Sequence, residues 1–297
     1  MAQPTERPPS DTLGGLTNLQ KRTLSAAVLL PVVIAAVVLG HPYFTVLVAV
    51  FAGAMAWEFT TVAAHERVAS QTSPIPMPSV RGWRLIAALG IVTALLAVIA
   101  TGFGRLEVPV WAIIVLGVFA TGVAVLVLSR RKALWFMLGV VYVATPAAAL
   151  VAIRAEPIYG TASLVWIVAL VAAADTGGYV AGRSIGGPKL APRISPNKTW
   201  AGLGGAVAGA AIVGLLTAFV LNHTNVWMLT LMSAVLGLFE QGGDLVESAF
   251  KRHFGVKDTS QIIPGHGGVL DRVDGLLAVA VAVVVANEWT GGSVLAW

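Results

Sequence analysis

The chain has 297 residues, of which 57% are hydrophobic and only 11% are charged, with a mean hydropathy of +0.84. Soluble proteins carry about 25% charged residues, so this composition excludes a soluble enzyme, a secreted disulfide scaffold and a disordered chain. The absence of cysteine from the sequence also excludes disulfides, thiolate metal sites and cysteine nucleophiles.

Apolar runs long enough to cross a bilayer recur from Leu24 onward. The predicted spans are 24–40, 43–64, 85–102, 108–128, 133–153, 161–180, 201–221, 226–247 and 269–287. Residues 1–23 are polar and are predicted to form a flexible cytoplasmic N-terminal tail. The first span is interpreted as a retained anchor, because many similar runs follow it. We therefore expect an all-α, polytopic integral membrane protein with nine transmembrane helices.

The distribution of Lys and Arg predicts the orientation. If the N-terminus is cytoplasmic, all 19 Lys and Arg residues except Arg105 and Arg154 fall in cytoplasmic segments. Basic residues accumulate on that side of a membrane, and a miscounted span would disrupt the alternation. The C-terminus is then outside. The accumulation of Lys and Arg in cytoplasmic segments also accounts for the net charge of +5. Because the sequence has no basic-aromatic pattern, this charge does not indicate a nucleic-acid partner.

The two halves of the chain differ in charge. Residues 24–155 are predicted to be a scaffold of five helices, with Glu58 as the one acidic residue inside its spans. Residues 156–297 are predicted to be a catalytic region of four helices and cytoplasmic loops. Its acidic residues at or near membrane depth are Asp175, Glu240, Asp244, Glu247, Asp271 and Asp274. An ionised carboxylate there costs at least ~2.5 kcal/mol, so these groups need cations, basic side chains or water as partners.

One group of these residues is spaced for a single helix face. Glu240, Asp244, Glu247 or Ser248, and Lys251 follow one another at intervals of three or four residues. A glycine-rich loop follows, and Asp271 and Asp274 open the next helix. Hard oxygen ligands of this kind suit Mg²⁺ together with substrate phosphates.

The same region has groups that suit an anion. Glycine amides and a helix N-terminus can approach a phosphate, and Lys251, Arg252, Lys257 and Arg272 can balance its charge. Phosphoryl or nucleotidyl transfer depends on such positioning and charge neutralisation. The alternative is a set of intramembrane salt bridges with a plain Gly-Gly turn.

A second polar cluster runs from Asp175 through Arg183 to Trp200. It includes Lys189, Arg193, Ser195 and Lys198. One interpretation is a phosphate or nucleotide site that faces the first cluster, and the other is a solvated basic loop. Gly205 and Gly209, on the next span, instead predict close helix packing.

The stretch from Ser248 to Asp274 resembles the C-terminal signature of the phosphatidate cytidylyltransferases, also called CDP-diglyceride synthases. The matching positions are Ser248, Lys251, Arg252, Lys257, Asp258, Pro264, His266, Gly267, Gly268, Asp271, Arg272 and Asp274. The segment 175–200 is similar to another cytoplasmic loop of that family. The resemblance implies that CTP and phosphatidic acid react to give CDP-diacylglycerol and pyrophosphate, with Mg²⁺.

The resemblance also implies a homodimer in the membrane, with its active site open to the cytoplasm. The heavy use of Ala, Val and Gly suggests a bacterium, and hence a multi-pass plasma-membrane protein. Asp244, Asp271 and Glu247 are predicted as metal ligands, with a second cation left open. Lys251, Arg252, Arg272 and Asp274 are predicted as catalytic residues. The predicted substrate-binding residues are Asp175, Lys189, Arg193, Ser195, Lys198, Ser248, Lys257, His266, Gly267 and Gly268.

Three other classes of protein are alternatives to this family. Intramembrane carboxylates also occur in transporters and lipid flippases, but here they cluster in the second half and no inverted repeat is visible. A transferase that joins CDP-activated lipids to alcohols is disfavoured because its aspartate-glycine-alanine-arginine pattern is absent. A structural scaffold leaves the acidic residues unexplained.

Overall fold

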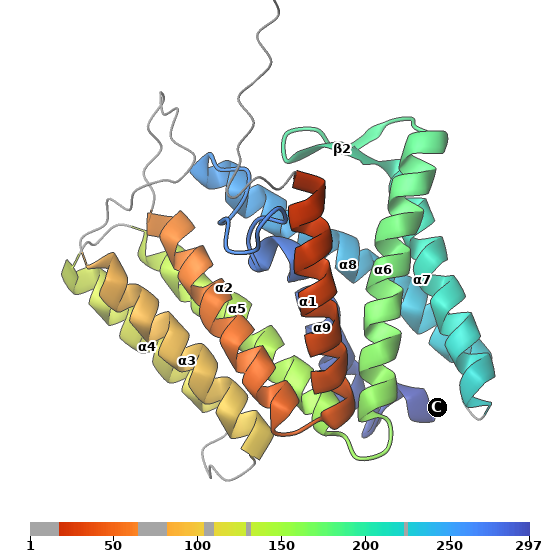
Figure 1. The fold of residues 1–297 in the computed structure, drawn as a ribbon, viewed down its shortest axis with the longest axis horizontal. Coiled ribbons are helices and arrows are strands. Elements are labelled where there is room, and N and C mark those ends of the chain that lie inside the picture. Colours follow the sequence, from red (N-terminus) through yellow and green to blue (C-terminus); the bar gives the residue numbers. More distant parts are fainter. Residues whose placement is uncertain (1–17, 65–81, 104–109, 129–131, 223–224) are drawn as a thin grey trace, which may run out of the picture.

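The fold was analysed in a computed structural model, which describes residues 18–64, 82–103, 110–128, 132–222 and 225–297. Nine α-helices lie within these residues (Figure 1). They are α1 (Asn18–Leu39), α2 (Tyr43–Ala64), α3 (Trp83–Phe103), α4 (Val110–Leu128), α5 (Ala133–Ala155), α6 (Gly160–Ser184), α7 (Trp200–Leu221), α8 (Val226–Phe254) and α9 (Leu270–Thr290). A short 3₁₀ helix, η1 (Val294–Ala296), follows α9. Each predicted span thus coincides with one helix.

Seven of the described helices, α1 to α7, are long and apolar enough to cross a membrane. Helices α8 and α9, which carry most of the acidic residues of the second half, are not among these seven. A polytopic membrane protein is therefore supported, while the count of nine spans and the sides on which the termini lie stay predictions. Of the predicted tail, residues 1–17 lie outside the described part of the chain, as do Arg67, Arg105 and Arg130.

The helices form two groups that meet at α9 (Figure 1). Helices α2, α3, α4 and α5 pack against one another, and α6, α7 and α8 form the second group. Helix α9 contacts both α5 and α8, so the helix that carries Asp271 and Asp274 lies where the predicted scaffold meets the predicted catalytic region. Continuous helices suit a membrane because each one satisfies its own backbone hydrogen bonds.

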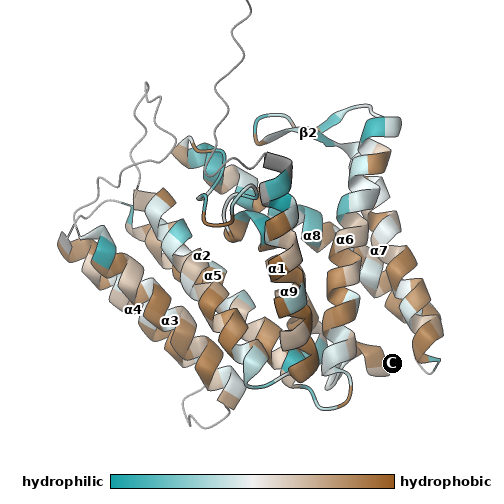
Figure 2. Ribbon diagram, in the orientation of Figure 1, coloured by the Kyte–Doolittle hydropathy of each residue, from teal (hydrophilic) through white to brown (hydrophobic). Residues whose placement is uncertain are grey.

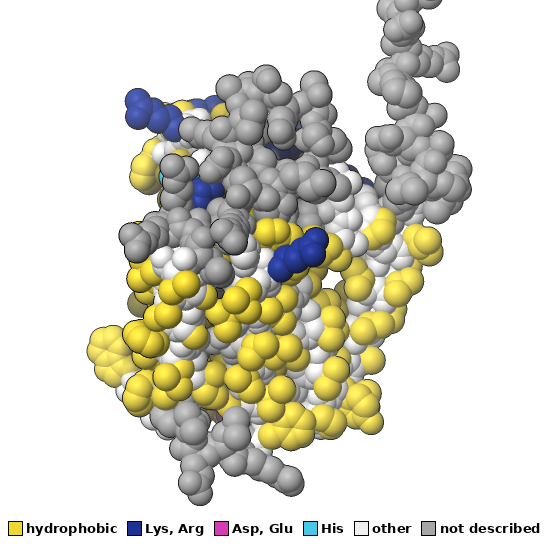
Figure 3. Space-filling model, turned by 90° about the vertical axis from the view of Figure 1, so that its left-hand side faces the viewer, with side chains coloured by type: hydrophobic (Ala, Val, Ile, Leu, Met, Phe, Trp, Pro, Cys, Tyr) yellow, Lys and Arg dark blue, Asp and Glu magenta, His cyan; other side chains and the backbone are white. Residues whose placement is uncertain are grey.

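The surface has the polarity of a membrane protein. Apolar side chains cover the described part of the face in Figure 3, and Lys and Arg lie toward one end. Trp111, Phe119 and Val127 on α4 are each more than two-thirds exposed. Figure 2 shows that hydrophilic residues gather at the end that holds β2 and the tops of α6 and α8. The polar chemistry is therefore concentrated at one end of an apolar bundle.

Close packing of α6 against α7 depends on small residues. A side chain at Gly205 would collide with the carbonyl oxygen of Gly177, and one at Gly209 would collide with the carbonyl of Ala173. Small residues let helix backbones approach closely in a membrane. The packing role predicted for Gly205 and Gly209 is confirmed.

The all-α class is confirmed, and a small antiparallel hairpin that was not predicted follows α6. It consists of β1 (Lys189–Ala191) and β2 (Ser195–Thr199), with Lys189 opposite Thr199. Just before it, Gly186 and Gly187 adopt positive φ angles that favour glycine. Thr199 then caps α7, since its hydroxyl accepts a hydrogen bond from the Gly202 amide at 3.0 Å. Outside the apolar spans, the two short strands satisfy each other's backbone groups.

Candidate active site

The hairpin reaches α8 through Lys198. Its ammonium lies 2.6 Å from Asp244 Oδ2 and donates to Gln241 Oε1 at 2.9 Å. Gln241 Nε2 in turn donates to the buried carboxylate of Glu240 at 2.9 Å. The two polar clusters of the sequence therefore face each other, as the site interpretation predicted.

A second ion-pair network joins the end of α8 to the start of α9. Lys251 Nζ lies 2.5 Å from Glu247 Oε2 and 2.8 Å from Asp271 Oδ1. Lys251 follows the predicted span 226–247, and burial there disfavours its charged form. The neighbouring carboxylates of Glu247 and Asp271 outweigh that effect and raise the pKa of Lys251 above its usual value. The lysine therefore keeps its positive charge between two carboxylates.

Both carboxylate oxygens of Asp271 accept hydrogen bonds. Oδ1 accepts from Lys251, and Oδ2 accepts at 2.9 Å from the Thr259 amide, the Thr259 hydroxyl and the Gly268 amide. Thr259 and Gly268 belong to residues 255–269, called here the α8–α9 loop. Asp271 thus fastens this loop to α9. Its role as a metal ligand stays a prediction.

Three other carboxylates come together beside it. Asp244, Glu247 and Asp274 each offer an oxygen, and these oxygens lie within 4.8 Å of one another. Glu247 is only 1% exposed, and its Oε1 has no hydrogen-bond partner. A buried carboxylate oxygen without a partner is costly, and a hard cation shared by three carboxylates would satisfy it. Asp244, Glu247 and Asp274 therefore fit Mg²⁺ by their chemistry and spacing.

A polar cleft of about 540 Å³ opens beside this acidic cluster. Four of the predicted residues line it: Asp175, Ser195, Lys198 and Asp244. The other lining residues are Gly178, Tyr179, Gly182, Arg183, Asn197, Thr199, Gly202, Leu203 and Gln241. The volume is within the usual range of about 300–1,000 Å³ for ligand pockets. Its glycines expose backbone that a bulky ligand can approach.

Four other predicted residues do not line the cleft: Ser248 contacts the cluster, Arg252 and Arg272 contact the α8–α9 loop, and Gly267 belongs to that loop. Ser248 donates to Asp244 Oδ1 at 3.1 Å. Arg272 donates through Nε to the His266 carbonyl at 2.7 Å, which braces the α8–α9 loop. Arg252 Nη1 donates to the Val256 carbonyl at 3.1 Å. Gly267 has a positive φ of 91° in the tight turn of this loop, which favours glycine.

Three predicted substrate-binding bases are exposed. Lys189 and Arg193 belong to the hairpin segment, and Lys257 belongs to the α8–α9 loop. None of the three lines the described cleft. Their roles in substrate binding stay predictions.

Sequence reasoning missed the role of Glu58, which is fully buried on α2. Its carboxylate accepts hydrogen bonds from the amides of Val269 and Leu270 at 2.9 and 2.8 Å. It also accepts from the Ser260 hydroxyl at 2.5 Å. The isolation of one acidic residue in an apolar span was the available signal, but nothing in the sequence indicated its partners.

Tyr142 and Gln241 were also missed. The Tyr142 hydroxyl is buried without a hydrogen-bond partner. It lies near the carboxylates of Glu247, Asp274 and Asp244. Gln241 links Lys198 to Glu240. A tyrosine or glutamine in an apolar span has no distinguishing spacing, so only the fold shows that they belong to the site.

The fold and site define a polytopic membrane protein with a polar cleft beside a carboxylate cluster. Residues 20–289 match the model of the cytidylyltransferase family. The chain is 35% identical over 267 residues to the phosphatidate cytidylyltransferase of Brucella suis. The aligned region covers 89% of this chain and 92% of that relative. It is 50% identical over 117 residues to the phosphatidate cytidylyltransferase of Staphylococcus epidermidis, covering 39% and 43% of the two chains. The chain belongs to the cytidylyltransferase family.

Proposed function

We propose that this protein is a CTP:phosphatidate cytidylyltransferase. It transfers CMP from CTP to phosphatidic acid and releases pyrophosphate, so that CDP-diacylglycerol becomes available for phospholipid synthesis. The family membership and the likeness to a phosphatidate cytidylyltransferase over 92% of that relative's length support this activity. The structural observation that carries it is the 2.6 Å ion pair of Lys198 and Asp244, which joins the polar cleft to the acidic cluster.

The residues divide the reaction between two neighbouring regions. Lys198 and Arg183, which line the cleft, bind the triphosphate of CTP, and the cleft glycines let it approach the backbone. Asp244, Glu247 and Asp274 hold Mg²⁺, which when bound neutralises phosphate charge. Lys251 keeps Glu247 and Asp271 in place and adds positive charge at the end of the cluster.

The chemistry needs no protein nucleophile. A phosphate oxygen of phosphatidate is anionic at neutral pH and attacks the α-phosphorus of CTP. The new P–O bond forms as the bond between the α-phosphorus and the α–β bridging oxygen breaks, and pyrophosphate leaves with that electron pair. The protein therefore contributes position and charge compensation, which dominate catalysis of this kind of reaction.

The protein is further proposed to be a homodimer in a bacterial plasma membrane, with the cleft facing the cytoplasm and the inner leaflet. The cytoplasmic placement rests on the positive-inside distribution of Lys and Arg. Phosphatidate reaches the cluster from the leaflet, and CTP reaches the cleft from water. Both substrates can then meet at the polar end of the bundle (Figure 2).

The test is pyrophosphate release by the purified protein in detergent, with phosphatidate, Mg²⁺ and each of the four nucleoside triphosphates in turn. Release with CTP alone, lost on chelation and restored by Mg²⁺, is the expected result. At the same Mg²⁺ concentration, an Asp274→Asn variant should release pyrophosphate much more slowly than the parent, while Glu288→Gln, at the far end of α9, should match the parent. Failure of the folded parent to release pyrophosphate with any nucleotide would overturn the proposal and favour a transporter.

A further inference from the structure

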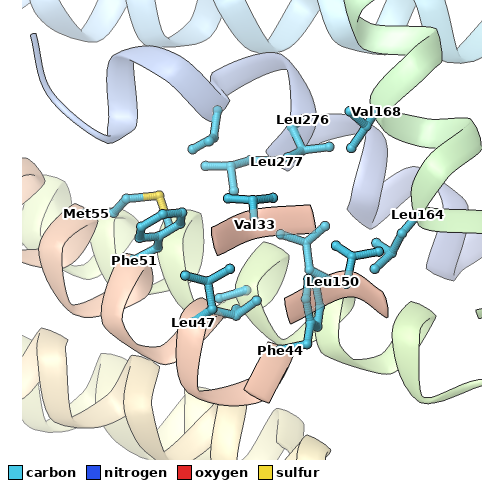
Figure 4. A pocket seen from close by; sticks show the side chains of 14 residues that line it. Val33, Phe44, Leu47, Phe51, Met55, Leu150, Leu164, Val168, Leu276 and Leu277 are labelled. Atoms are coloured by element: carbon cyan, nitrogen blue, oxygen red, sulfur yellow. The ribbon is translucent and has the colours of Figure 1, made fainter. Parts of the chain in front are cut away.

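The bundle contains an apolar cavity of about 250 Å³ between α1, α2, α5, α6 and α9 (Figure 4). All 14 lining residues are apolar, and they include Val33 on α1, Phe51 on α2 and Leu276 on α9. Protein interiors are normally close-packed, with few voids larger than a water molecule. An apolar void of this size has no partners for water. The cavity therefore suits a hydrocarbon.

A second apolar cavity lies next to this one, on the side of the α8–α9 loop. It has a volume of about 610 Å³ and lies between α1, α2 and the α8–α9 loop. Phe51 lines both cavities, and Ile262, Ile263 and Pro264 form the loop side of the second. Ser25 is the one polar residue among the described residues that line it, and its hydroxyl donates to the Pro264 carbonyl at 3.0 Å. The two neighbouring cavities, which share Phe51, are therefore lined almost entirely by apolar side chains.

The two cavities begin at the elements that build the polar site. Asp274 of the acidic cluster lies on α9 between Val273 and Leu276, which both line the inner cavity. A lipid whose phosphate lies at the cluster can thus extend a chain along this helix. Helix α1 lines both cavities and lies at the edge of the bundle, since only 6% of the residues in its apolar stretch are buried. A chain can therefore enter beneath α1 from the bilayer.

We propose that these two cavities form the binding site for one acyl chain of the phosphatidate substrate. The inference rests on the proposed function, which supplies a lipid with its phosphate at the cluster. A bilayer is as apolar as the cavity, so burial of the chain adds little affinity. The cavity instead orients the substrate and limits the length and shape of its chain. Phe51, at the junction, sets how much of the chain passes inward.

The first experiment compares variants of two adjacent residues on α1. Val33→Phe fills the inner cavity, whereas Val32→Phe adds the same bulk at a residue that is 48% exposed. The ratio of kcat/KM for dipalmitoyl to that for dioctanoyl phosphatidate is measured in mixed micelles. Val33→Phe should lower this ratio about tenfold, with Val32→Phe within about twofold of the parent. An unchanged ratio in Val33→Phe would overturn the proposal.

A variant with the opposite effect covers the case in which Val33→Phe does not fold. Phe51→Ala joins the two cavities more widely. It should raise kcat/KM for the branched diphytanoyl phosphatidate relative to dipalmitoyl phosphatidate. No change in that relative value would count against the site. The dioctanoyl activity in every variant shows separately whether the transferase function itself is intact.

A cross-linking experiment tests the site without turnover. Phosphatidate with a diazirine at the end of one chain is photolysed with the protein in the absence of CTP. Label on the cavity residues of α1, α2 or α9, displaced by phosphatidate but not by phosphatidylcholine, supports the proposal. Label confined to exposed residues such as Val32, or equal displacement by both lipids, overturns it. Because no nucleotide is present, failure of the transferase activity cannot produce either result.

Discussion

Glu58 on α2 accepts a hydrogen bond at 2.8 Å from the backbone amide of Leu270, the first residue of α9. It accepts another at 2.9 Å from the Val269 amide. The first amides of a helix have no partner within the helix, so a buried carboxylate at this position satisfies them. A residue of the N-terminal half thus holds the start of the helix that carries Asp271 and Asp274.

Replacement of Glu58 should therefore reduce catalysis from a distance. Glu58→Ala leaves buried amides without an acceptor, and each unpaired amide lowers the stability of the fold by about 1–3 kcal/mol. The variant should have a lower kcat, with a smaller effect on KM for CTP. Glu58→Gln retains one acceptor oxygen, so its kcat and its stability should lie between those of Glu58→Ala and those of the parent. Kinetics and thermal inactivation in detergent measure both effects. If Glu58→Ala had the parent's kcat, a positioning role for Glu58 would be excluded.

Much of this fold was predictable because hydropathy reports helices directly in a membrane. Each of the nine predicted spans coincides with a helix, and most ends agree within a few residues. The hairpin at 189–199 was missed, because two short strands in a basic loop have no periodicity to detect. Contact between the loop of Lys198 and the helix of Asp244 was predicted only by the interpretation as a phosphate or nucleotide site. The alternative was a solvated basic loop.

The details of the acidic site were less predictable. Helical spacing placed Asp271 and Asp274 at the start of one helix, but it could not distinguish a ligand from a structural carboxylate. The hydrogen bonds from Thr259 and Gly268 to Asp271 could not be predicted either, because these donors reach Asp271 only after the loop has folded. The role of Glu58 depends on contacts more than 200 residues apart in the sequence, which a single sequence does not indicate.

Asp274→Asn and Asp271→Asn should differ in their dependence on Mg²⁺. Asp274 belongs to the carboxylate group that fits the cation, so its loss should raise the Mg²⁺ concentration required for half-maximal activity by about tenfold or more. Asp271 instead fastens the loop, so Asp271→Asn should reduce kcat with little change in that concentration. Mg²⁺ titrations of pyrophosphate release make the comparison. A larger shift for Asp271→Asn would reverse the two assignments.

Lys198→Met should weaken CTP binding, because Lys198 lines the cleft and pairs with Asp244. Loss of one charge-assisted contact costs about 1.5–3 kcal/mol, so KM for CTP should rise by about tenfold or more. Lys189→Met provides the matched control, since Lys189 lies exposed on the same hairpin and does not line the cleft. Equal effects of the two substitutions would mean that the basic loop acts only through its overall charge.

Gly268→Ala tests how tightly the α8–α9 loop packs against the carboxylates of Asp271 on α9 and Glu58 on α2. A Cβ at Gly268 would collide with the Thr259 hydroxyl and lie 2.9 Å from both Asp271 Oδ2 and Glu58 Oε1. Overpacking of this kind costs about 1–3 kcal/mol, and here it would displace both carboxylates from the loop. We expect a lower inactivation temperature and a reduced kcat.

Gly204→Ala is the matched control, because nothing lies within 4 Å of the Cβ that it would add on α7. Alanine is also the better helix former there, by about 1 kcal/mol, so the variant should be as stable as the parent or more so. Inactivation temperature and kcat are measured for both variants under the same conditions. A Gly268→Ala enzyme with the stability and kcat of Gly204→Ala would show that the loop adjusts freely. Asp271 and Glu58 would then not hold it in the position on which the site depends.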